Sequence, residues 1–435
     1  MKLISHLLLI PLLLAECQTD RSKEINKKVE HPSSRYLDEY FSAHTELNDF
    51  NGCVLVRKGD TLLLRKAYNM YLDTAHSMRV NSYSQFDIHS VSKLMAQAII
   101  IDLEAAGKMN RSDLLSEYLP DFPNGDRITV QHLLDNASGI PRELQNIEAP
   151  EEGWNADSLI KAIAQQELEF DPGTDKRYSN LGYQLVYYIV AQVTGKPFGL
   201  YVSDEVFYPL GMDDSGAHPY TDEKNLREYA INHEADDDTV EAVTHYFNDS
   251  KPMARLYSTI DDLDKYLEML ESEPYRSQLA SDKGIIAWSG GSDGIRAYIH
   301  SNVPEGYHYV LLANYDGIAM QNIINDIEHI MAGEEYEIPK ALNRIAVPVD
   351  VQTLEKYIGI YDFMEADHLE LEFVIERDSL AVYQEGERLA TLFAENDSVF
   401  FSDPTDQESF TFLPSQGGEK MLMDWLGISF EGYRK

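Results

Sequence analysis

Two short segments of this chain place a serine three residues before a lysine, a spacing that suits nucleophilic catalysis. They are Ser90–Lys93, with the sequence SVSK, and Ser158–Lys161, with the sequence SLIK. On a helix, residues three apart lie on the same face, so the lysine amine can reach the serine hydroxyl and assist removal of its proton. Two such segments are roughly what chance gives in a chain of this length, so their surroundings must separate them.

The surroundings favour Ser90. An extended run at 86–88 precedes it, and an apolar helical pattern covers 89–106. Free N–H groups and the helix dipole at such a helix start favour a developing oxyanion. Ser158 instead follows Asn155 and Asp157 at an exposed helix start, which predicts a capping serine and a solvated Lys161. We take Ser90 as the candidate nucleophile and Lys93 as its partner.

A tyrosine is a further candidate for proton transfer. Tyr-x-Asn occurs at Tyr178–Asn180 and at Tyr246–Asn248. Tyr178 follows a tight turn at 171–174 and precedes a helical run, and loops at element boundaries commonly carry catalytic side chains. A buried lysine with a lowered pKa, or a phenolate stabilised by that lysine, can act as the base. An isolated Tyr-x-Asn is usually structural, and only the presence of Ser90 and Lys93 makes Tyr178 a candidate.

Two other patterns are weaker. Gly290–Gly294 fits Gly-x-Ser-x-Gly, the nucleophile elbow, which needs a strand before it and a helix after it. The run 296–301 alternates like a strand, so we reject Ser292 as nucleophile. His233, Glu234, 236–238 and His245 match no His-Glu-x-x-His spacing. We interpret them as a solvated acidic loop, and we expect neither a metal nor a cofactor.

The remaining patterns predict an α+β fold. Two strands at 53–56 and 62–67 form a hairpin, and three further strands lie at 284–288, 296–301 and 307–313. Helices are predicted at 35–47, 157–168, 179–194, 197–209, 259–271 and 320–331. This order indicates one antiparallel sheet flanked by helices, with an all-helical insertion between its halves. We predict a domain at 35–333, a linker at 334–350, and a small barrel-like all-β domain at 351–435.

The first 17 residues resemble a targeting segment. Met1-Lys2 is followed by an apolar run at 3–14, which is too short to span a bilayer and suits a secretory signal peptide. The segment 14–17 is similar to a lipoprotein cleavage box that ends in Cys17, although Glu16 stands where a small residue is usual. Two alternatives remain open: Cys17 carries a lipid anchor, or it is an ordinary signal-peptide residue. Both predict an exported protein, periplasmic or at the cell surface.

The net charge excludes some partners. The chain has a formal charge of −38, with 36 Lys and Arg against 74 Asp and Glu. Such a surface repels phosphate backbones and anionic lipid headgroups, so we expect no nucleic acid partner and no membrane contact except through Cys17. The expected partner is a small-molecule or short peptide substrate.

The motifs together resemble the serine β-lactamase-related hydrolases, which include class C β-lactamases, DD-peptidases and family VIII esterases. The resemblance covers roughly 35–330 in the same order. It rests on 86–93, 103–108, 118–120, 128–134, 138–141, 172–174, 178–180 and 209–212. The C-terminal residues resemble the lipocalin-like β-domains that are appended to many of these hydrolases.

The resemblance implies roles for individual residues. Ser90 would form the acyl-enzyme, Lys93 and Tyr178 would share the base role, and Asn180 would hold the substrate amide or the lysine. The third motif, usually Lys- or His-Thr-Gly on an edge strand, corresponds to Trp288–Gly290, including Ser289. The backbone N–H groups of Ser90 and Gly291 would form the oxyanion hole.

Trp288 is the departure from the family pattern. A cation at this position normally helps to bind a substrate carboxylate, and Trp cannot supply that charge. We therefore expect a small ester, amide or peptide substrate rather than efficient hydrolysis of β-lactams. The alternative is a catalytically silent penicillin-binding-like protein that binds cell-wall fragments or partners.

Overall fold

A computed structural model describes residues 31–70, 78–150, 153–218, 226, 228–236, 239–243, 255–366, 368–413 and 419–435. The signal segment with Cys17, the second Tyr-x-Asn at Tyr246–Asn248, and His245 lie outside the described residues. None of the described helices is long and apolar enough to cross a membrane.

The centre of the N-terminal region is an antiparallel sheet with the strand order β2-β1-β10-β9-β8. Its strands are β1 (Gly52–Lys58), β2 (Thr61–Tyr68), β8 (Ile285–Ser292), β9 (Ile295–Asn302) and β10 (Tyr307–Ala313). The two halves of the sheet come from opposite ends of this region, as the sequence predicts, and β8 lies at one edge. Both faces of β1 are covered, which explains its continuous apolar run.

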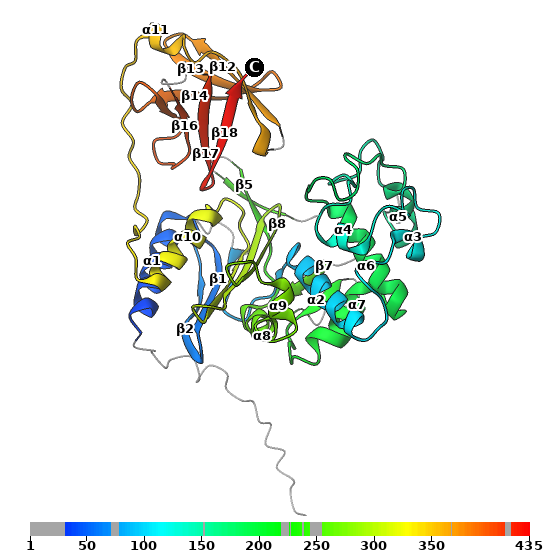
Figure 1. The fold of residues 1–435 in the computed structure, drawn as a ribbon. Helices are drawn as coiled ribbons and strands as arrows, with labels where there is room; N and C mark the ends of the chain where they lie inside the picture. The colour runs from blue at the N-terminus through cyan, green and yellow to red at the C-terminus, as the bar shows by residue number, and fades with distance from the viewer. Residues whose placement is uncertain are drawn as a thin grey trace, which may run out of the picture.

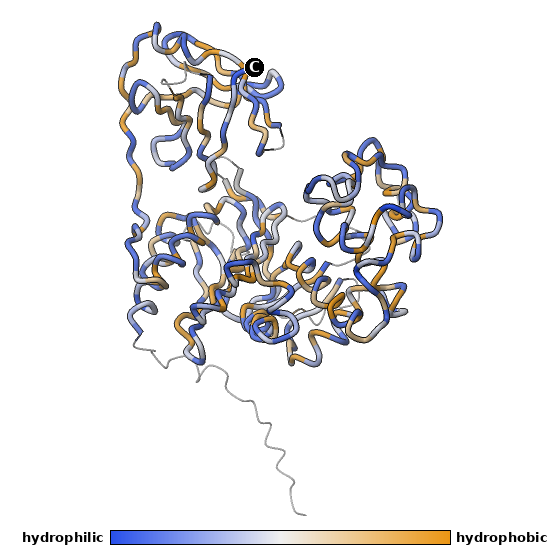
Figure 2. Tube along the Cα trace, viewed as in Figure 1, coloured by the Kyte–Doolittle hydropathy of each residue, from blue (hydrophilic) through white to orange (hydrophobic). Residues whose placement is uncertain are grey.

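Helices cover the two faces of the sheet (Figure 1). On one face α1 (Pro32–Leu47) and α10 (Met320–Ala332) pack against Val54, Val56 and Leu311. On the other face α2 (Val91–Ala105) and α8 (Ile260–Leu270) pack against Cys53 and Leu55. In Figure 2 the apolar stretches gather along these inner strands and helix faces, while the outer loops are largely hydrophilic. Burial of Cys53 raises the pKa of its thiol, consistent with a core position.

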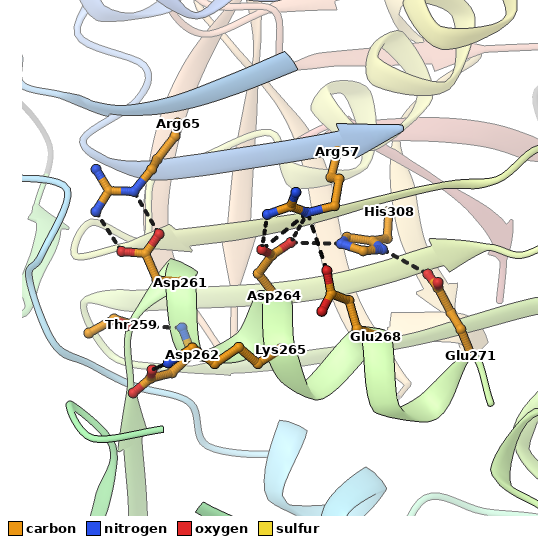
Figure 3. Close-up of polar contacts among 10 residues, drawn as sticks. All are labelled: Arg57, Arg65, Thr259, Asp261, Asp262, Asp264, Lys265, Glu268, Glu271 and His308. Atoms are coloured by element: carbon orange, nitrogen blue, oxygen red, sulfur yellow. Dashed lines mark hydrogen bonds and ion pairs between the residues drawn. The ribbon is translucent and has the colours of Figure 1, made fainter. Parts of the chain in front are cut away.

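Charged side chains add to the contact between α8 and the sheet (Figure 3). Asp264 accepts a hydrogen bond from Arg57 Nε on β1 at 2.9 Å. His308 on β10 lies between two carboxylates, with Nε2 2.7 Å from Asp264 Oδ1 and Nδ1 2.7 Å from Glu271 Oε1. Because both ring nitrogens face carboxylate oxygens, the protonated imidazolium is the form that satisfies both.

The insertion between β2 and β8 is mainly helical. Besides α2 and α8 it contains α3 (Leu115–Tyr118), α4 (Val130–Leu134), α5 (Ala156–Ile163), α6 (Asn180–Thr194), α7 (Phe198–Val202) and α9 (Tyr275–Leu279). The helix α7 continues into a π-turn at Ser203–Phe207. The prediction of an all-helical insertion is wrong in one respect, because short strands also occur: β3 (Phe86–Asp87), β4 (Gly216–His218), β5 (His233–Asp236), β6 (Thr239–Ala242) and β7 (Arg255–Ser258). Each has only two to four residues, too few for an alternating pattern to be recognised.

The C-terminal strands form a closed antiparallel barrel in sequence order. The strands are β11 (Gly359–Phe363), β12 (Leu369–Glu376), β13 (Ser379–Gln384), β14 (Glu387–Ala394), β15 (Val399–Phe401), β16 (Ser409–Phe412), β17 (Lys420–Trp425) and β18 (Ile428–Arg434), with the short helix α11 (Val351–Leu354) before them and a 3-10 turn at Met364–Ala366. An extended segment joins this barrel to α10 (Figure 1). The turn between β17 and β18 reaches α10, since a Cβ at Gly427 would lie 2.8 Å from the Asn322 side chain.

Candidate active site

Ser90 lies in the turn that leads from β3 into α2. The residue before it, His89, has a φ of 40°, in the left-handed region that a non-glycine residue rarely occupies. Hydrogen bonds from Val91 N to Ile88 O and from Ser92 N to His89 O, both 3.0 Å, close this turn. Ser90 itself has helical dihedrals, and its side chain lines a cavity. Strained backbone of this kind is often found at functional sites, where the surrounding structure maintains it.

Lys93 is one turn further along α2 and contacts the Ser90 hydroxyl. Its Nζ lies 2.8 Å from Ser90 Oγ and 2.8 Å from Asn180 Oδ1, and the side chain is buried. The rings of Tyr178 and Tyr183 lie 4.8 and 5.6 Å from the same nitrogen. Aromatic faces attract a cation, so these contacts reduce the cost of placing the amine in a buried position.

Tyr178 approaches Ser90 from the loop before α6. Its hydroxyl donates a hydrogen bond to Ser90 Oγ at 2.8 Å. Asn136 holds the loop, because its side-chain oxygen accepts from Ser179 N and its carbonyl accepts from Arg177 N. Burial raises the pKa of Tyr178, and the hydrogen bond to Ser90 and the positive charge of Arg142 act in the opposite direction.

Asn180 is the first residue of α6 and connects Lys93 to a residue that the sequence analysis missed. Its Oδ1 accepts from Lys93, and its Nδ2 donates to Glu143 Oε1. The amide therefore has one orientation, with the oxygen towards the lysine. Glu143 lies two residues after the Ser138–Pro141 motif. It was missed because the segment that resembles the family stops at Pro141 and resumes only at 172.

The edge strand β8 forms another wall of the site. The prediction that this strand ends at Trp288 is wrong, because β8 continues to Ser292 and includes Ser289, Gly290 and Gly291. Gly290 allows close backbone approach: a Cβ there would lie 2.2 Å from Ile88 O and 3.0 Å from Ser90 N. Trp288 packs edge-on against the Tyr183 ring, with centroids 6.3 Å apart.

The cavity has a volume of about 520 Å³, within the range of small-molecule sites. Ser90, Tyr178 and Asn180 line it together with Ala287, Trp288, Ser289 and Gly291 of β8, and with Arg142. The structure thus brings most of the predicted residues to one cavity, while Lys93 and Gly290 lie behind its lining and contact Ser90. Arg142 was missed, although it directly follows the Ser138–Pro141 motif in the sequence.

None of the rejected candidates lines this cavity. Ser158 forms a capping box with Asn155 at the start of α5, and Lys161 is exposed. Ser292 ends β8 and is followed by a tight turn into β9, so no strand–helix elbow surrounds it. The interpretation of His233 and Glu234 as part of a solvated loop is wrong, because both belong to β5 and His233 is buried. The described residues contain no group of three or more His, Cys, Asp or Glu side chains that could hold a metal ion.

Comparison with known proteins identifies the family. A family model described as "Beta-lactamase" matches residues 37–317. PbpX of Bacillus subtilis (strain 168), described as a penicillin-binding protein, is 27% identical over 293 residues, covering 66% of this chain and 72% of the relative.

Two solved structures share the fold. A D-amino acid amidase from Ochrobactrum anthropi SV3 has a TM-score of 0.60 at 17% identity, covering 68% of this chain and 99% of the amidase. EstCE1, titled a hydrolase with promiscuous acyltransferase activity, has a TM-score of 0.57 at 18% identity, covering 69% of this chain and 98% of EstCE1. Because the family model matches more than half of the sequence, the chain belongs to the beta-lactamase family of serine hydrolases.

Proposed function

We propose that this protein is an exported hydrolase that forms an acyl-enzyme on Ser90 and acts on a small ester, amide or short peptide. The observation that carries the proposal is that Ser90 Oγ lies 2.8 Å from both Lys93 Nζ and Tyr178 OH. A serine hydroxyl is a weak nucleophile until a neighbouring group accepts its proton, and these two groups are within reach of that proton.

In the acylation step Ser90 Oγ attacks the substrate carbonyl carbon, and its proton passes to the Lys93–Tyr178 pair. We treat the two groups as one unit, because both contact Ser90 Oγ and either is within reach of the transferred proton. The same pair then protonates the leaving alcohol or amine as the scissile bond breaks. In deacylation a water molecule gives its proton to the pair and attacks the acyl-enzyme, which releases the acid and restores Ser90.

The backbone N–H groups of Ser90 and Gly291 are proposed to bind the oxyanion. Ser90 precedes α2, where backbone N–H groups have no helical acceptor, and β8 approaches it closely at Gly290. Donors that are already in position where negative charge develops lower the barrier without reorganisation. Asn180 holds Lys93 in place and is proposed to bind a substrate amide.

The β8 wall shapes the substrate preference. Trp288, Ser289 and Gly290 carry no charge, so this wall offers no cation to a substrate carboxylate. Packing of Trp288 against Tyr183 supports a structural role for the indole. The structural neighbours named as an amidase and a hydrolase support an ester or amide as substrate.

We also propose that residues 1–17 direct export, with Cys17 as a candidate lipid anchor. A second candidate function is a silent penicillin-binding-like protein, which the uncharged Trp288 favours. The short contacts between Ser90, Lys93 and Tyr178 favour the enzyme, since the complete set of proton-transfer groups would serve no purpose in a protein that only binds.

Hydrolysis of 4-nitrophenyl butyrate by the purified protein, measured beside Ser90→Ala and Ser158→Ala, tests the proposal. Ser158 is the matched control, since it belongs to the other Ser-x-x-Lys segment but only caps α5. We expect Ser90→Ala to reduce turnover to background and Ser158→Ala to retain it. Equal activity of all three proteins would place the nucleophile elsewhere, and no turnover by the unaltered protein would favour the silent binding protein.

A further inference from the structure

Arg142 brings a positive charge to the cavity from a different wall than Trp288. It lines the cavity together with Ser90, Tyr178 and Asn180, and its guanidinium carbon lies 5.8 Å from the centre of the Tyr178 ring. The side chain is exposed, so an incoming substrate can reach it. The chain has a net charge of −38, so a cation that lines the cavity gives this site a local positive charge that an anionic ligand could use.

The main chain of Arg142 is held against the start of α6. Its carbonyl oxygen accepts hydrogen bonds from Asn180 N at 3.1 Å and Leu181 N at 3.3 Å. The preceding carbonyl, that of Pro141, accepts from Ser179 Oγ at 2.8 Å. The backbone of Arg142 is therefore fixed against the segment that carries Tyr178 and Asn180.

The charge of Arg142 is not neutralised by its neighbour. The adjacent Glu143 directs its carboxylate to Asn180 Nδ2. Within the described ranges of the chain, the Arg142 guanidinium forms neither an ion pair nor a hydrogen bond. Other arginines of the same region are paired, for example Arg177 with Glu169 at 3.1 Å and Arg127 with Asp171 at 2.6 Å. The five N–H donors of Arg142 are thus available to a ligand, and their planar fork matches a carboxylate.

We propose that Arg142 is a specificity-determining residue that binds a carboxylate group of the substrate. The inference rests on the proposed hydrolase function and extends it: the cation absent from β8 is supplied by the segment between α4 and α5, which is hydrogen-bonded to the start of α6. The preferred substrate is then a small ester or amide with one anionic group, and this group lies on the Arg142 side of the cavity while Trp288 contacts an uncharged part.

The test compares matched chromogenic esters. One pair places the carboxylate in the acyl group, as 4-nitrophenyl hydrogen glutarate against 4-nitrophenyl pentanoate. The other places it in the leaving group, as 3-carboxy-4-nitrophenyl butyrate against 4-nitrophenyl butyrate. Each ester is measured with the unaltered protein, Arg142→Gln, Arg142→Glu and the control Arg177→Gln. The control removes the same charge one residue from Tyr178, at a side chain that does not line the cavity.

We expect Arg142→Gln to lower kcat/KM about 10- to 100-fold for the anionic member of at least one pair, mainly through KM. The neutral esters should change by less than about threefold, Arg142→Glu should lose more than Arg142→Gln, and Arg177→Gln should preserve the ratio. The preference should weaken as ionic strength rises, because the charge is exposed. The pair that responds shows which side of the scissile bond carries the anion.

Failure of this inference can be distinguished from failure of the proposed function. Hydrolysis that depends on Ser90 but falls equally for anionic and neutral esters in Arg142→Gln would overturn this inference, and would indicate that Arg142 acts on Tyr178. Hydrolysis that is absent, or that persists in Ser90→Ala, would instead overturn the proposed function.

Discussion

A Cβ atom on Gly290 would lie 2.2 Å from the carbonyl oxygen of Ile88, two residues before Ser90. The backbone of the edge strand β8 and the turn into α2 are therefore in direct contact at this point. Any larger side chain would force the two elements apart. This contact fixes where Gly291 lies relative to Ser90, and with it the proposed oxyanion hole.

Gly290→Ala should disturb both stability and activity. We expect the free energy of unfolding to fall by about 2 kcal/mol or more, because the added methyl group overlaps backbone atoms that cannot rotate away. We expect kcat/KM for a neutral ester to fall about 100-fold, since a displacement of about 1 Å at a catalytic site can have that effect. Urea unfolding and steady-state kinetics measure the two changes.

Gly291→Ala is the stability control, because a Cβ there meets its nearest atoms at 3.4 Å, an ordinary contact distance. Its free energy of unfolding should stay close to that of the unaltered protein. If Gly290→Ala unfolds at the same urea concentration as Gly291→Ala, the close approach of β8 to the Ser90 turn does not exist in solution.

Lys93 and Tyr178 should behave as one catalytic unit. Lys93→Ala and Tyr178→Phe are each expected to lower kcat about 10²- to 10⁴-fold, the usual range for loss of a general acid or base. The double variant should be little worse than either single variant, because either loss disables the shared proton transfer. Strictly multiplicative effects in this double-mutant cycle would show that the two groups act independently.

Glu143 should act through Asn180 as a positioning residue. Glu143→Ala removes the acceptor of Asn180 Nδ2, so the amide can turn and present a donor to the Lys93 amine. We expect kcat to fall about 10-fold with little change in KM. Glu143→Gln retains an acceptor oxygen and should recover most of the loss. If the Gln variant is as slow as the Ala variant, the negative charge of Glu143 matters rather than the hydrogen bond.

His308 should make stability depend on pH. Burial lowers the pKa of His308, but hydrogen bonds and charges from Asp264 and Glu271 outweigh burial and raise this pKa to about 9. A folded pKa above the unfolded value of 6.5 stabilises the folded state fully below about pH 6.5, and this stabilisation is lost as the pH rises through about 9. The difference corresponds to about 3 kcal/mol.

His308→Gln tests this linkage. The difference in unfolding free energy between the unaltered protein and this variant should shrink by about 2–3 kcal/mol from pH 6 to pH 9.5. Asp264 and Glu271 have lowered pKa values, so both remain ionised over this range. A difference that is the same at both pH values would mean that His308 is neutral in the folded protein.

Local patterns in the sequence were sufficient to predict the main helices and strands. The apolar spacing after Ser90 predicted α2, and the alternating runs at 296–301 and 307–313 predicted β9 and β10. Rejection of Ser292 followed from the same alternation and is consistent with the β8–β9 hairpin. Each of these features depends on residues close together in the chain, which periodicity reports directly.

Features that depend on distant contacts could not be predicted. The close approach of Gly290 to the Ile88 backbone joins residues about 200 positions apart in the sequence. Glu143 and Arg142 enter the site only because their loop is hydrogen-bonded to the start of α6. The left-handed conformation of His89 could not be predicted from its residue type, because histidine usually avoids this region.

Covalent labelling tests whether Ser90 is the nucleophile. The purified protein, Ser90→Ala and Ser158→Ala are each incubated with a fluorophosphonate and analysed by intact-mass spectrometry, with peptide mapping of any adduct. We expect one adduct, on the peptide that contains Ser90, in the unaltered protein and in Ser158→Ala, and none in Ser90→Ala. An adduct of the same mass that persists in Ser90→Ala would show that another residue is the nucleophile.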